Sequence, residues 1–237
     1  MRVALLEDDP ALSVQMAEIL EGDGRDCRSF GTVAAIETGL RRDTFDLLIL
    51  DWMLPDGTAI DLLHRLRQSD KPVPPTIIVT VRDAEGDIVT ALQAGADDYL
   101  TKPIRPAEFR ARVGALLRRT YPVSRETQLT FGAYVFDQPS ATLTVNGERV
   151  VLTGKEYELA LLLFQNMHRP LSRAYIMERA WGLAADLPTR TLDVHISRLR
   201  SKLNLRPETG FRLTSLHNYG YRLDQIEAGA AEPAYSS

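Results

Sequence analysis

The chain has 237 residues, a length that suits two domains better than one, and 44% of its residues are hydrophobic, a proportion that allows a packed core. Its net charge of −4 is divided unevenly: residues 1–120 carry 15 Lys and Arg against 20 Asp and Glu, and residues 121–237 carry 13 against 12. No apolar run approaches the ~20 residues that span a bilayer, the first residues do not resemble a secretory signal, and a lone Cys27 excludes an intrachain disulfide. We therefore expect a cytoplasmic protein with two parts and no membrane partner.

In the first half, short apolar runs alternate with amphipathic stretches. This alternation favours a parallel sheet covered by helices on both faces. The predicted strands, of which the second is weakest, are Val3–Leu6, Cys27–Phe30, Leu47–Leu50, Thr76–Val79 and Asp98–Leu100. The predicted helices are Ala11–Leu20, Val33–Leu40, Ala59–Leu66, Asp87–Ala94 and Ala107–Arg118. The fold class expected for residues 1–119 is α/β, with a doubly wound five-stranded sheet.

Polar residues stand where the chain leaves these strands. They are Glu7, Asp8 and Asp9 after the first strand, Asp51 after the third, Thr80 after the fourth and Lys102 after the fifth. Open α/β sheets bind ligands at the edge where the carboxyl ends of their strands meet. Gathered carboxylates need a cation, and oxygen ligands suit Mg²⁺, while a lysine and a hydroxyl can bind phosphate. Each residue alone is more often a turn or a cap, but together they predict a phosphoryl-handling site with a carboxylate nucleophile.

The second half follows another pattern. Val145–Glu148 contains Asn-Gly, a strong hairpin signal, and Thr153–Glu156 has the spacing of a helix capping box. Predicted helices Tyr157–Met167, Arg173–Trp181 and Thr189–Leu203 precede a β-rich segment, Phe211–Leu223. We expect an α+β winged helix-turn-helix domain at 128–225, a polar linker at 120–127 and a disordered tail at 226–237.

The helix predicted at Thr189–Leu203 has two different faces. Leu192, Ile196, Leu199 and Leu203 form an apolar stripe that can dock the helix on a core. The opposite face is expected to enter a DNA groove and carries Arg190, Thr191, Val194, Ser197, Arg198 and Ser201. Arg200 lies better placed for the DNA backbone. The charge pattern alone is also compatible with a basic face that binds nothing.

The motifs "LLEDDP", "LILDWMLPDG", "VT" at 79–80 and "GADDYLTKP" resemble those of bacterial response-regulator receiver domains. The segments "LTGKEYELALLLF", "RTLDVHISRLRSKL" and "GYRL" resemble the winged-helix domain of the OmpR/PhoB subfamily. The resemblance implies that Asp51 accepts a phosphoryl group, that Glu7, Asp8, Asp51 and the carbonyl of Met53 hold Mg²⁺, and that Lys102 pairs with the phosphoryl group. It also implies a cis Lys102–Pro103 bond and a switch pair of Thr80 and Tyr99.

Partners follow from the same resemblance. A sensor histidine kinase would phosphorylate the chain, which would dimerise and bind tandem half-sites on double-stranded DNA. The dimer face implied by the family has charged positions at Asp97, Asp98, Glu108, Arg112 and Arg119. The segment Gly182–Pro188 corresponds to the loop that contacts RNA polymerase in this subfamily.

Three positions depart from the subfamily pattern. Val81 stands where a small residue is usual and is expected to narrow access to Asp51 and slow phosphoryl exchange. Ile88 replaces a basic residue, which leaves Glu108 without its usual partner across the dimer, although exposed pairs contribute only ~0–1 kcal/mol. His217 and Asn218 replace Arg and Gly in the wing, where Asn tolerates a positive φ. We expect a weak wing contact that strengthens toward pH 6.

Other function classes fit the residues less well. Phosphatases and phosphotransferases that use an aspartyl-phosphate carry a second Asp two residues after the nucleophile, where this chain has Met53. A nucleotide-binding oxidoreductase needs glycines after the first strand, and an adaptor for proteins alone does not need a basic helix face. We therefore expect no enzymatic role. A regulator of the same fold that works without phosphorylation stays open as an alternative.

Overall fold

A computed structural model describes residues 1–69, 72–122, 126–182 and 190–226. The chain divides into two compact units, Met1–Val123 and Ser124–Ser237. The division falls within the segment 120–127 predicted as a linker, while the predicted tail lies outside the described residues from 227 on. Within the described ranges, no helix is both long enough and apolar enough to cross a membrane.

The N-terminal unit is built on a five-stranded parallel sheet, as the sequence predicts. Its strands are β1 (Arg2–Leu6), β2 (Asp26–Phe30), β3 (Leu47–Asp51), β6 (Thr76–Thr80) and β7 (Asp98–Thr101). Their order is β2-β1-β3-β6-β7, so the chain moves from β1 to one edge and then returns to the other side of β1. The connections diverge between β1 and β3, which is where such sheets bind ligands.

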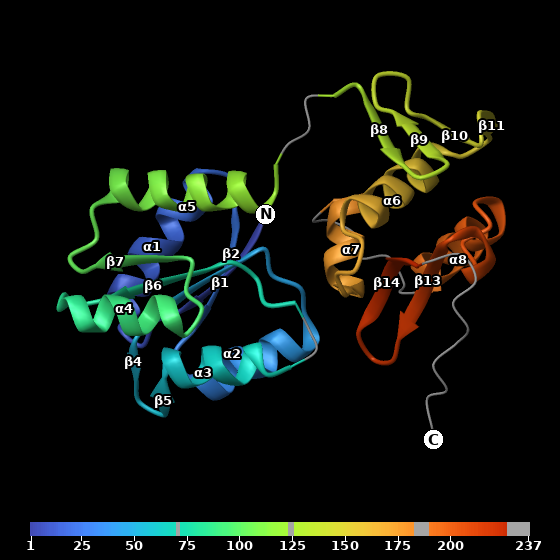
Figure 1. Ribbon diagram of the computed structural model, residues 1–237. Coiled ribbons are helices and arrows are strands. Elements are labelled where there is room, and N and C mark those ends of the chain that lie inside the picture. The colour runs from blue at the N-terminus through green and yellow to red at the C-terminus, as the bar shows by residue number, and fades with distance from the viewer. Residues whose placement is uncertain (70–71, 123–125, 183–189, 227–237) are drawn as a thin grey trace. The chain divides into compact units, whose positions relative to one another are not determined.

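Helices cover both faces of this sheet (Figure 1). The helices α1 (Pro10–Gly22) and α5 (Pro106–Thr120) pack against one face through Val3 and Leu5. The helices α2 (Val33–Arg42), α3 (Ala59–Arg67) and α4 (Glu85–Gln93) pack against the other through Ala4 and Leu6. Neighbouring residues of a strand point to opposite faces, so a sheet buried on both sides needs the unbroken apolar runs that the sequence shows.

A small hairpin follows the third strand and was not predicted. It consists of β4 (Met53–Leu54) and β5 (Gly57–Thr58), which pair antiparallel. Two-residue strands leave no periodicity in the sequence, so only the turn residues between them were visible. The helix α4 also begins two residues before the predicted Asp87, at Glu85.

The described residues of the C-terminal unit combine antiparallel sheets with helices (Figure 1). The first sheet holds β8 (Gln128–Phe131), β9 (Tyr134–Asp137), β10 (Thr142–Val145) and β11 (Glu148–Val150). The helices α6 (Gly154–Gln165), α7 (Arg173–Trp181) and α8 (Arg190–Lys202) follow, with the short strand β12 (Leu171–Ser172) before α7. The final hairpin is formed by β13 (Phe211–Leu216) and β14 (Gly220–Gln225), and β14 also pairs with β12. This is the α+β winged helix expected from the sequence.

Local signals in the C-terminal unit formed as predicted. Asn146 and Gly147 take φ values of +52° and +83° in the turn between β10 and β11. Thr153 and Glu156 form a reciprocal capping box at the start of α6. Aromatic rings fill the core, where the centroids of Phe136 and Phe164 lie 5.2 Å apart. Turn chemistry and capping act over a few residues, which is why sequence alone could predict them.

Candidate functional site

The acidic residues of the N-terminal unit gather at the carboxyl edge of its sheet. Glu7 and Asp8 follow β1, and Asp51 is the last residue of β3, the neighbouring strand. One ligand oxygen from each of these three carboxylates lies within 4.8 Å of the others. Glu7 and Asp51 are 3% and 8% exposed, whereas Asp8 is exposed. The sequence-predicted cluster is therefore assembled by the topology of the sheet.

The ammonium group of Lys102 also contacts this cluster. It follows β7, and its Nζ lies 2.6 Å from Asp51 Oδ2 and 2.8 Å from Glu7 Oε2. The Lys102–Pro103 peptide bond is cis, as the resemblance implied. Lys102 lies 51 positions after Asp51 and 95 positions after Glu7 in sequence, yet its ammonium group contacts both side chains. Together with Thr80, residues from four separate segments of the chain lie at this edge.

Electrostatics leave this cluster short of positive charge. Burial raises the pKa of Glu7, the hydrogen bond from Lys102 opposes the rise, and the charge of Asp51 adds to it. Burial would lower the pKa of Lys102, but its hydrogen bonds to Asp51 and Glu7 outweigh that effect and raise it. Glu7 Oε2 is buried and makes no hydrogen bond of acceptable geometry, although Lys102 Nζ is close to it. One ammonium among three carboxylates leaves room for a further cation.

Two acids near the cluster have other tasks. Asp9 caps α1, because its side chain accepts hydrogen bonds from the backbone N–H groups of Ala11 and Leu12. Asp56, in the β4–β5 turn, accepts bonds from the N–H groups of Val33 and Ala34 at the start of α2, and these bonds lower the pKa of Asp56. The cap fixes the hairpin that carries Met53, whose side chain is largely exposed. The role of Asp56 was missed because its partner segment lies 22 residues earlier.

Beside the cluster, Thr80 is the last residue of β6, and Tyr99 lies on the neighbouring strand β7. Thr80 is 1% exposed, and its Oγ1 accepts a long, 3.4 Å hydrogen bond from the backbone N–H of Arg82. The hydroxyl of Tyr99 donates to the carbonyl oxygen of Arg82 at 2.7 Å, so the ring is already in a buried position. The guanidinium of Arg82 lies 5.0 Å from the ring centroid of Trp52, the residue after Asp51. Both members of the proposed switch pair therefore bind the same segment.

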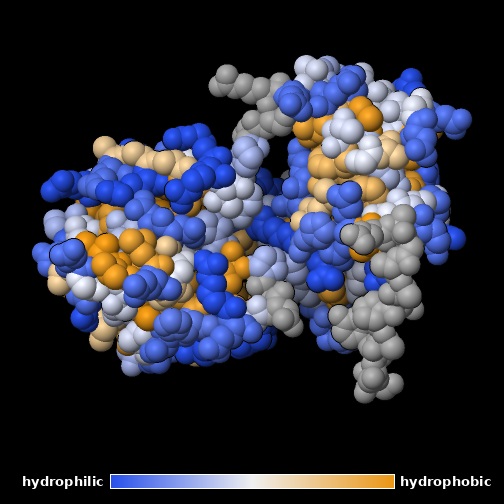
Figure 2. Space-filling view, viewed as in Figure 1, coloured by the Kyte–Doolittle hydropathy of each residue, from blue (hydrophilic) through white to orange (hydrophobic). Residues whose placement is uncertain are grey.

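Three of the five residues predicted for a dimer face, Asp98, Glu108 and Arg112, are joined by ion pairs within one chain. Arg112 Nη1 lies 3.0 Å from Asp98 Oδ1, and Arg112 Nη2 lies 2.9 Å from Glu108 Oε1. Asp97 Oδ2 accepts a hydrogen bond from the backbone N–H of Thr76, and Arg119 is exposed near the end of α5. Figure 2 shows apolar surface over α4, where Val89 and Leu92 are 44% and 46% exposed. Ile88 packs partly against the core, and Val81 is 73% exposed.

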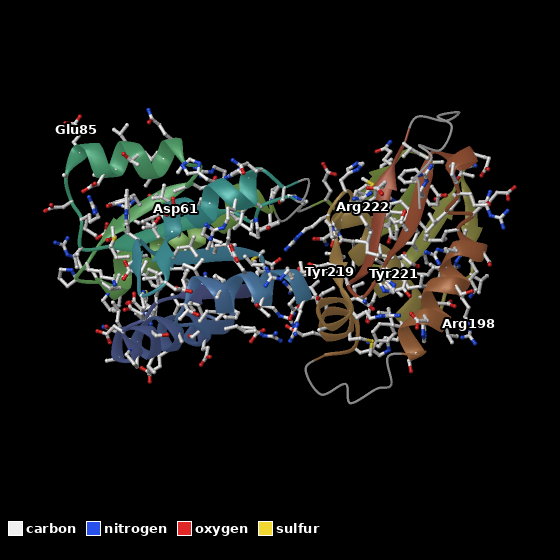
Figure 3. All side chains as sticks on the ribbon, turned by 90° about the horizontal axis from the view of Figure 1, so that it is seen from below. Asp61, Glu85, Arg198, Tyr219, Tyr221 and Arg222 are labelled. Atoms are coloured by element: carbon white, nitrogen blue, oxygen red, sulfur yellow. The ribbon has the colours of Figure 1, made fainter. Side chains whose placement is uncertain are left out.

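In the C-terminal unit, α8 is docked as its sequence pattern predicts. Leu192, Ile196, Leu199 and Leu203 are each at most 1% exposed. Val194, Ser197 and Arg198 are exposed on the other side and Thr191 is half-buried, while the side chain of Arg190 lies outside the described part of the structure. Figure 3 shows Arg198 extending outward from α8. A stripe of buried leucines fixes the rotation of the helix and hence the face that can meet DNA.

Two cations at the end of α8 have partners inside the protein. Arg200 donates from Nε and Nη2 to the carbonyl oxygen of Leu213 at 3.0 and 2.7 Å, and from Nη2 to Ser215 Oγ at 3.0 Å. Lys202 Nζ lies 2.7 Å from Oε2 of the buried Glu156. A helical wheel gives the face of a residue but not its long-range partners, so the sequence could not show that these charges tie α8 to other elements.

The wing is the turn between β13 and β14. His217 and Asn218 are exposed there, and Asn218 has a φ of +54°, which asparagine tolerates and which confirms that the turn persists without glycine. His195, by contrast, packs edge-on against Trp181 with ring centroids 5.2 Å apart. Residues 183–188 of the predicted polymerase-contacting loop lie outside the described part of the chain.

Comparison with known proteins adds family names to this geometry. Residues 3–114 match the response regulator receiver domain, and residues 147–223 match the C-terminal domain of transcriptional regulatory proteins. The DNA-binding response regulator MtrA of Mycolicibacterium smegmatis is 34% identical over 221 residues, covering 93% of this chain and 96% of MtrA. The sensory transduction protein RegX3 of Mycobacterium bovis is 35% identical over 225 residues, covering 94% and 98%. The solved structure of DrrB, an OmpR/PhoB homolog from Thermotoga maritima, is 27% identical and covers 94% and 98%, with a TM-score of 0.45.

Proposed function

Because this chain belongs to the two-component response regulators that join a receiver domain to an OmpR/PhoB-type DNA-binding domain, we propose that a phosphoryl group on Asp51 switches it. Proteins of this family regulate transcription and are not a class of enzyme. The observation that carries the proposal is the convergence of Lys102 Nζ on Asp51 Oδ2, at 2.6 Å, and on Glu7. We place the protein in the cytoplasm, where a regulator meets both its kinase and its DNA.

In the proposed reaction, a carboxylate oxygen of Asp51 attacks the phosphorus of a phosphohistidine on a sensor kinase. The O–P bond forms as the P–N bond breaks, and the departing imidazole nitrogen keeps the electron pair. Lys102 is placed to neutralise charge on the phosphoryl oxygens. The product is an acyl phosphate, whose phosphoryl group carries roughly 1.5–2 negative charges in place of the single charge of the carboxylate.

Magnesium fits the donor set at this edge. Glu7, Asp8 and Asp51 supply carboxylate oxygens, and the carbonyl of Met53 follows Asp51 by two residues. Mg²⁺ prefers oxygen ligands of this kind, and the buried Glu7 oxygen without a hydrogen bond suits a cation. When bound, the ion supplies positive charge that holds phosphoryl oxygens against the carboxylates.

Thr80 and Tyr99 would carry the signal away from Asp51, and Val81, the residue after Thr80, would limit access to that aspartate. The hydroxyl of Thr80 can donate to a new phosphoryl oxygen, which would end its long bond to the N–H of Arg82. Tyr99 holds the carbonyl of the same residue, so the segment after β6 would move with both side chains. To move such an equilibrium fully between two states requires about 5.5 kcal/mol of differential binding, and several charge-assisted hydrogen bonds can supply it.

The C-terminal unit would bind DNA through α8 and the wing. The predicted contacts are Arg190, Thr191, Val194, Ser197, Arg198, Arg200 and His217. Arg198 is the strongest candidate for reading bases, whereas Arg200 would act chiefly by holding β13. Phosphorylated receivers would pair through the face of Asp97, Asp98, Glu108, Arg112 and Arg119, bringing two C-terminal units onto tandem half-sites and RNA polymerase.

The phosphoacceptor can be tested directly. The full chain is incubated with acetyl phosphate and MgCl₂, reduced with borohydride, digested and analysed by mass spectrometry. We expect one modified residue, Asp51, with no modification in Asp51→Asn and normal modification in Asp61→Asn, which changes an exposed acid on α3. Modification elsewhere would overturn the assignment. No modification together with DNA binding would favour the phosphorylation-independent regulator.

A further inference from the structure

The recognition helix α8 carries an acid that its expected role does not explain. Asp193 is the one acidic residue between Thr189 and Arg206, a segment that also holds four arginines and a lysine. An acid beside DNA phosphates repels them and weakens binding. The side chain of Asp193 is 45% exposed, so burial does not hide its charge.

Asp193 joins three separate elements through a single oxygen. Its Oδ1 accepts hydrogen bonds from Nη1 and Nη2 of Arg173, at 2.7 and 2.5 Å, and a short one from the hydroxyl of Tyr221. Arg173 is the first residue of α7. Tyr221, labelled in Figure 3, lies on β14, the second strand of the wing hairpin. One carboxylate therefore connects α7, α8 and the wing.

The ring of Tyr221 lies near two guanidinium groups. Arg173 Cζ is 5.3 Å and Arg200 Cζ is 5.9 Å from the ring centroid, within the range of cation–π attraction. Arg200 in turn donates to Leu213 and Ser215 on β13. Tyr221 is 5% exposed and stands four residues after His217 of the wing turn. Both strands of the hairpin are thus fixed to α8 at the base of the wing.

We propose that Asp193 is a positioning residue that sets the place of the wing and of Arg173 relative to the recognition helix. A recognition helix and a wing contact different parts of a DNA site, so their relative placement decides whether both fit one sequence. Asp193 acts through Arg173 and Tyr221 and does not itself touch DNA. This inference rests on the proposed function, because it assumes that α8 and the wing meet DNA.

Electrostatic repulsion alone predicts that removing the charge of Asp193 changes DNA affinity in the opposite direction, which makes the proposal testable. If Asp193 only repels phosphates, Asp193→Asn tightens binding to every DNA sequence. If Asp193 positions the wing, the same change weakens binding to a selected site, and binding to unrelated DNA falls much less. Tyr221→Phe removes one hydroxyl and keeps the ring, so it tests the same contact in a variant that retains its packing.

The experiment uses the full chain and a duplex that the wild type selects from a random pool, with a scrambled duplex for comparison. We expect Asp193→Asn to weaken binding to the selected duplex about tenfold and Tyr221→Phe about threefold, with little change for the scrambled one. The matched control is Asp224→Asn, which changes an acid of the same hairpin that pairs with Arg222 at 2.9 Å. Circular dichroism checks that each variant is folded.

Three results would overturn the proposal in different ways. Unchanged or tighter binding by folded Asp193→Asn and Tyr221→Phe would refute the positioning role and leave the DNA-binding function intact. Failure of the wild type to select any duplex would remove the proposed function together with the inference. Equal loss on both duplexes would also reject it, because positioning acts on the selected site.

Discussion

Each unit of the molecule buries a glutamate beside a lysine, and the pKa of that glutamate is shifted in opposite directions in the two units. Lys102 Nζ lies 2.8 Å from Glu7 in the N-terminal unit, and Lys202 Nζ lies 2.7 Å from Glu156 in the C-terminal unit. The pKa of Glu7 is raised, chiefly by burial. Burial also acts to raise the pKa of Glu156, but hydrogen bonds from Lys202 and the backbone of Thr153 outweigh it and lower the pKa.

The neighbours of each pair explain the difference. Glu7 shares its lysine with Asp51 and has Asp8 nearby, so negative charge accumulates. Glu156 has a capping box at the N-terminus of α6, where backbone N–H groups and the helix dipole favour a carboxylate. The second pair is satisfied by Lys202 and the backbone of Thr153, whereas in the first, one ammonium group is shared between two carboxylates. Unsatisfied charge of this kind is typical of functional sites.

Removing each lysine should break the comparison most sharply. We expect Lys102→Met to slow phosphorylation of Asp51 by acetyl phosphate about 100-fold, because the transition state loses its ammonium group. Lys202→Met should leave that rate unchanged and lower the free energy of unfolding of the C-terminal unit by about 2 kcal/mol, since Glu156 loses its charged partner.

Both effects can be followed in the same proteins. Phosphorylation is measured on phosphate-affinity gels, and urea unfolding is followed by tryptophan fluorescence. Each unit contains one tryptophan, Trp52 or Trp181, so Trp52→Phe or Trp181→Phe isolates the signal of one unit. A slow reaction in Lys202→Met would contradict the division of roles.

Replacing each glutamate by glutamine should give changes of opposite direction. Glu156→Gln is expected to lower the free energy of unfolding of its unit by about 1.5 kcal/mol, because charge-assisted hydrogen bonds are weakened. Glu7→Gln, measured in EDTA, should raise that of the N-terminal unit by about 1 kcal/mol, because a crowded buried charge is removed. The same sign for both variants would show that the two pairs are equivalent.

The pH dependence of unfolding gives a further test of the pair formed by Glu156 and Lys202. The folded-state pKa of Glu156 lies below 4.5, the ordinary value of a glutamate. Its contribution to stability is therefore present above pH 4.5 and is lost as the pH falls through the folded pKa. We expect the urea midpoint of the C-terminal unit to fall in this window, with a flatter profile in Glu156→Gln, as reported by Trp181 fluorescence. Parallel profiles for the two proteins would reject the assignment.

The smallest expected effect concerns the wing. A histidine that carries a proton attracts DNA phosphates, and His217 is exposed in the wing turn. We expect His217→Ala to weaken binding to the selected duplex about twofold to threefold at pH 6 and less at pH 7.5. Equal affinities of wild type and variant at both pH values, measured by fluorescence anisotropy, would remove His217 from the DNA contacts.

The extent of prediction from sequence differs between the two units for physical reasons. In the first unit, the ends of the strands determine the site, so the topology of a parallel sheet was enough to predict that Glu7, Asp51 and Lys102 lie close together. In the second, the buried stripe of α8 could be predicted, but the partners of Arg200, Lys202 and Asp193 could not. Those contacts join residues 13, 46 and 28 positions apart in sequence, and no short-range pattern encodes them.

The central claim is that charge added at Asp51 controls DNA binding by the other unit. Its most direct test is binding to the selected duplex, together with sedimentation, with and without beryllofluoride and MgCl₂. We predict that beryllofluoride tightens binding and promotes dimers of the wild type and changes neither property of Asp51→Asn. Identical behaviour of both proteins under both conditions would contradict the claim.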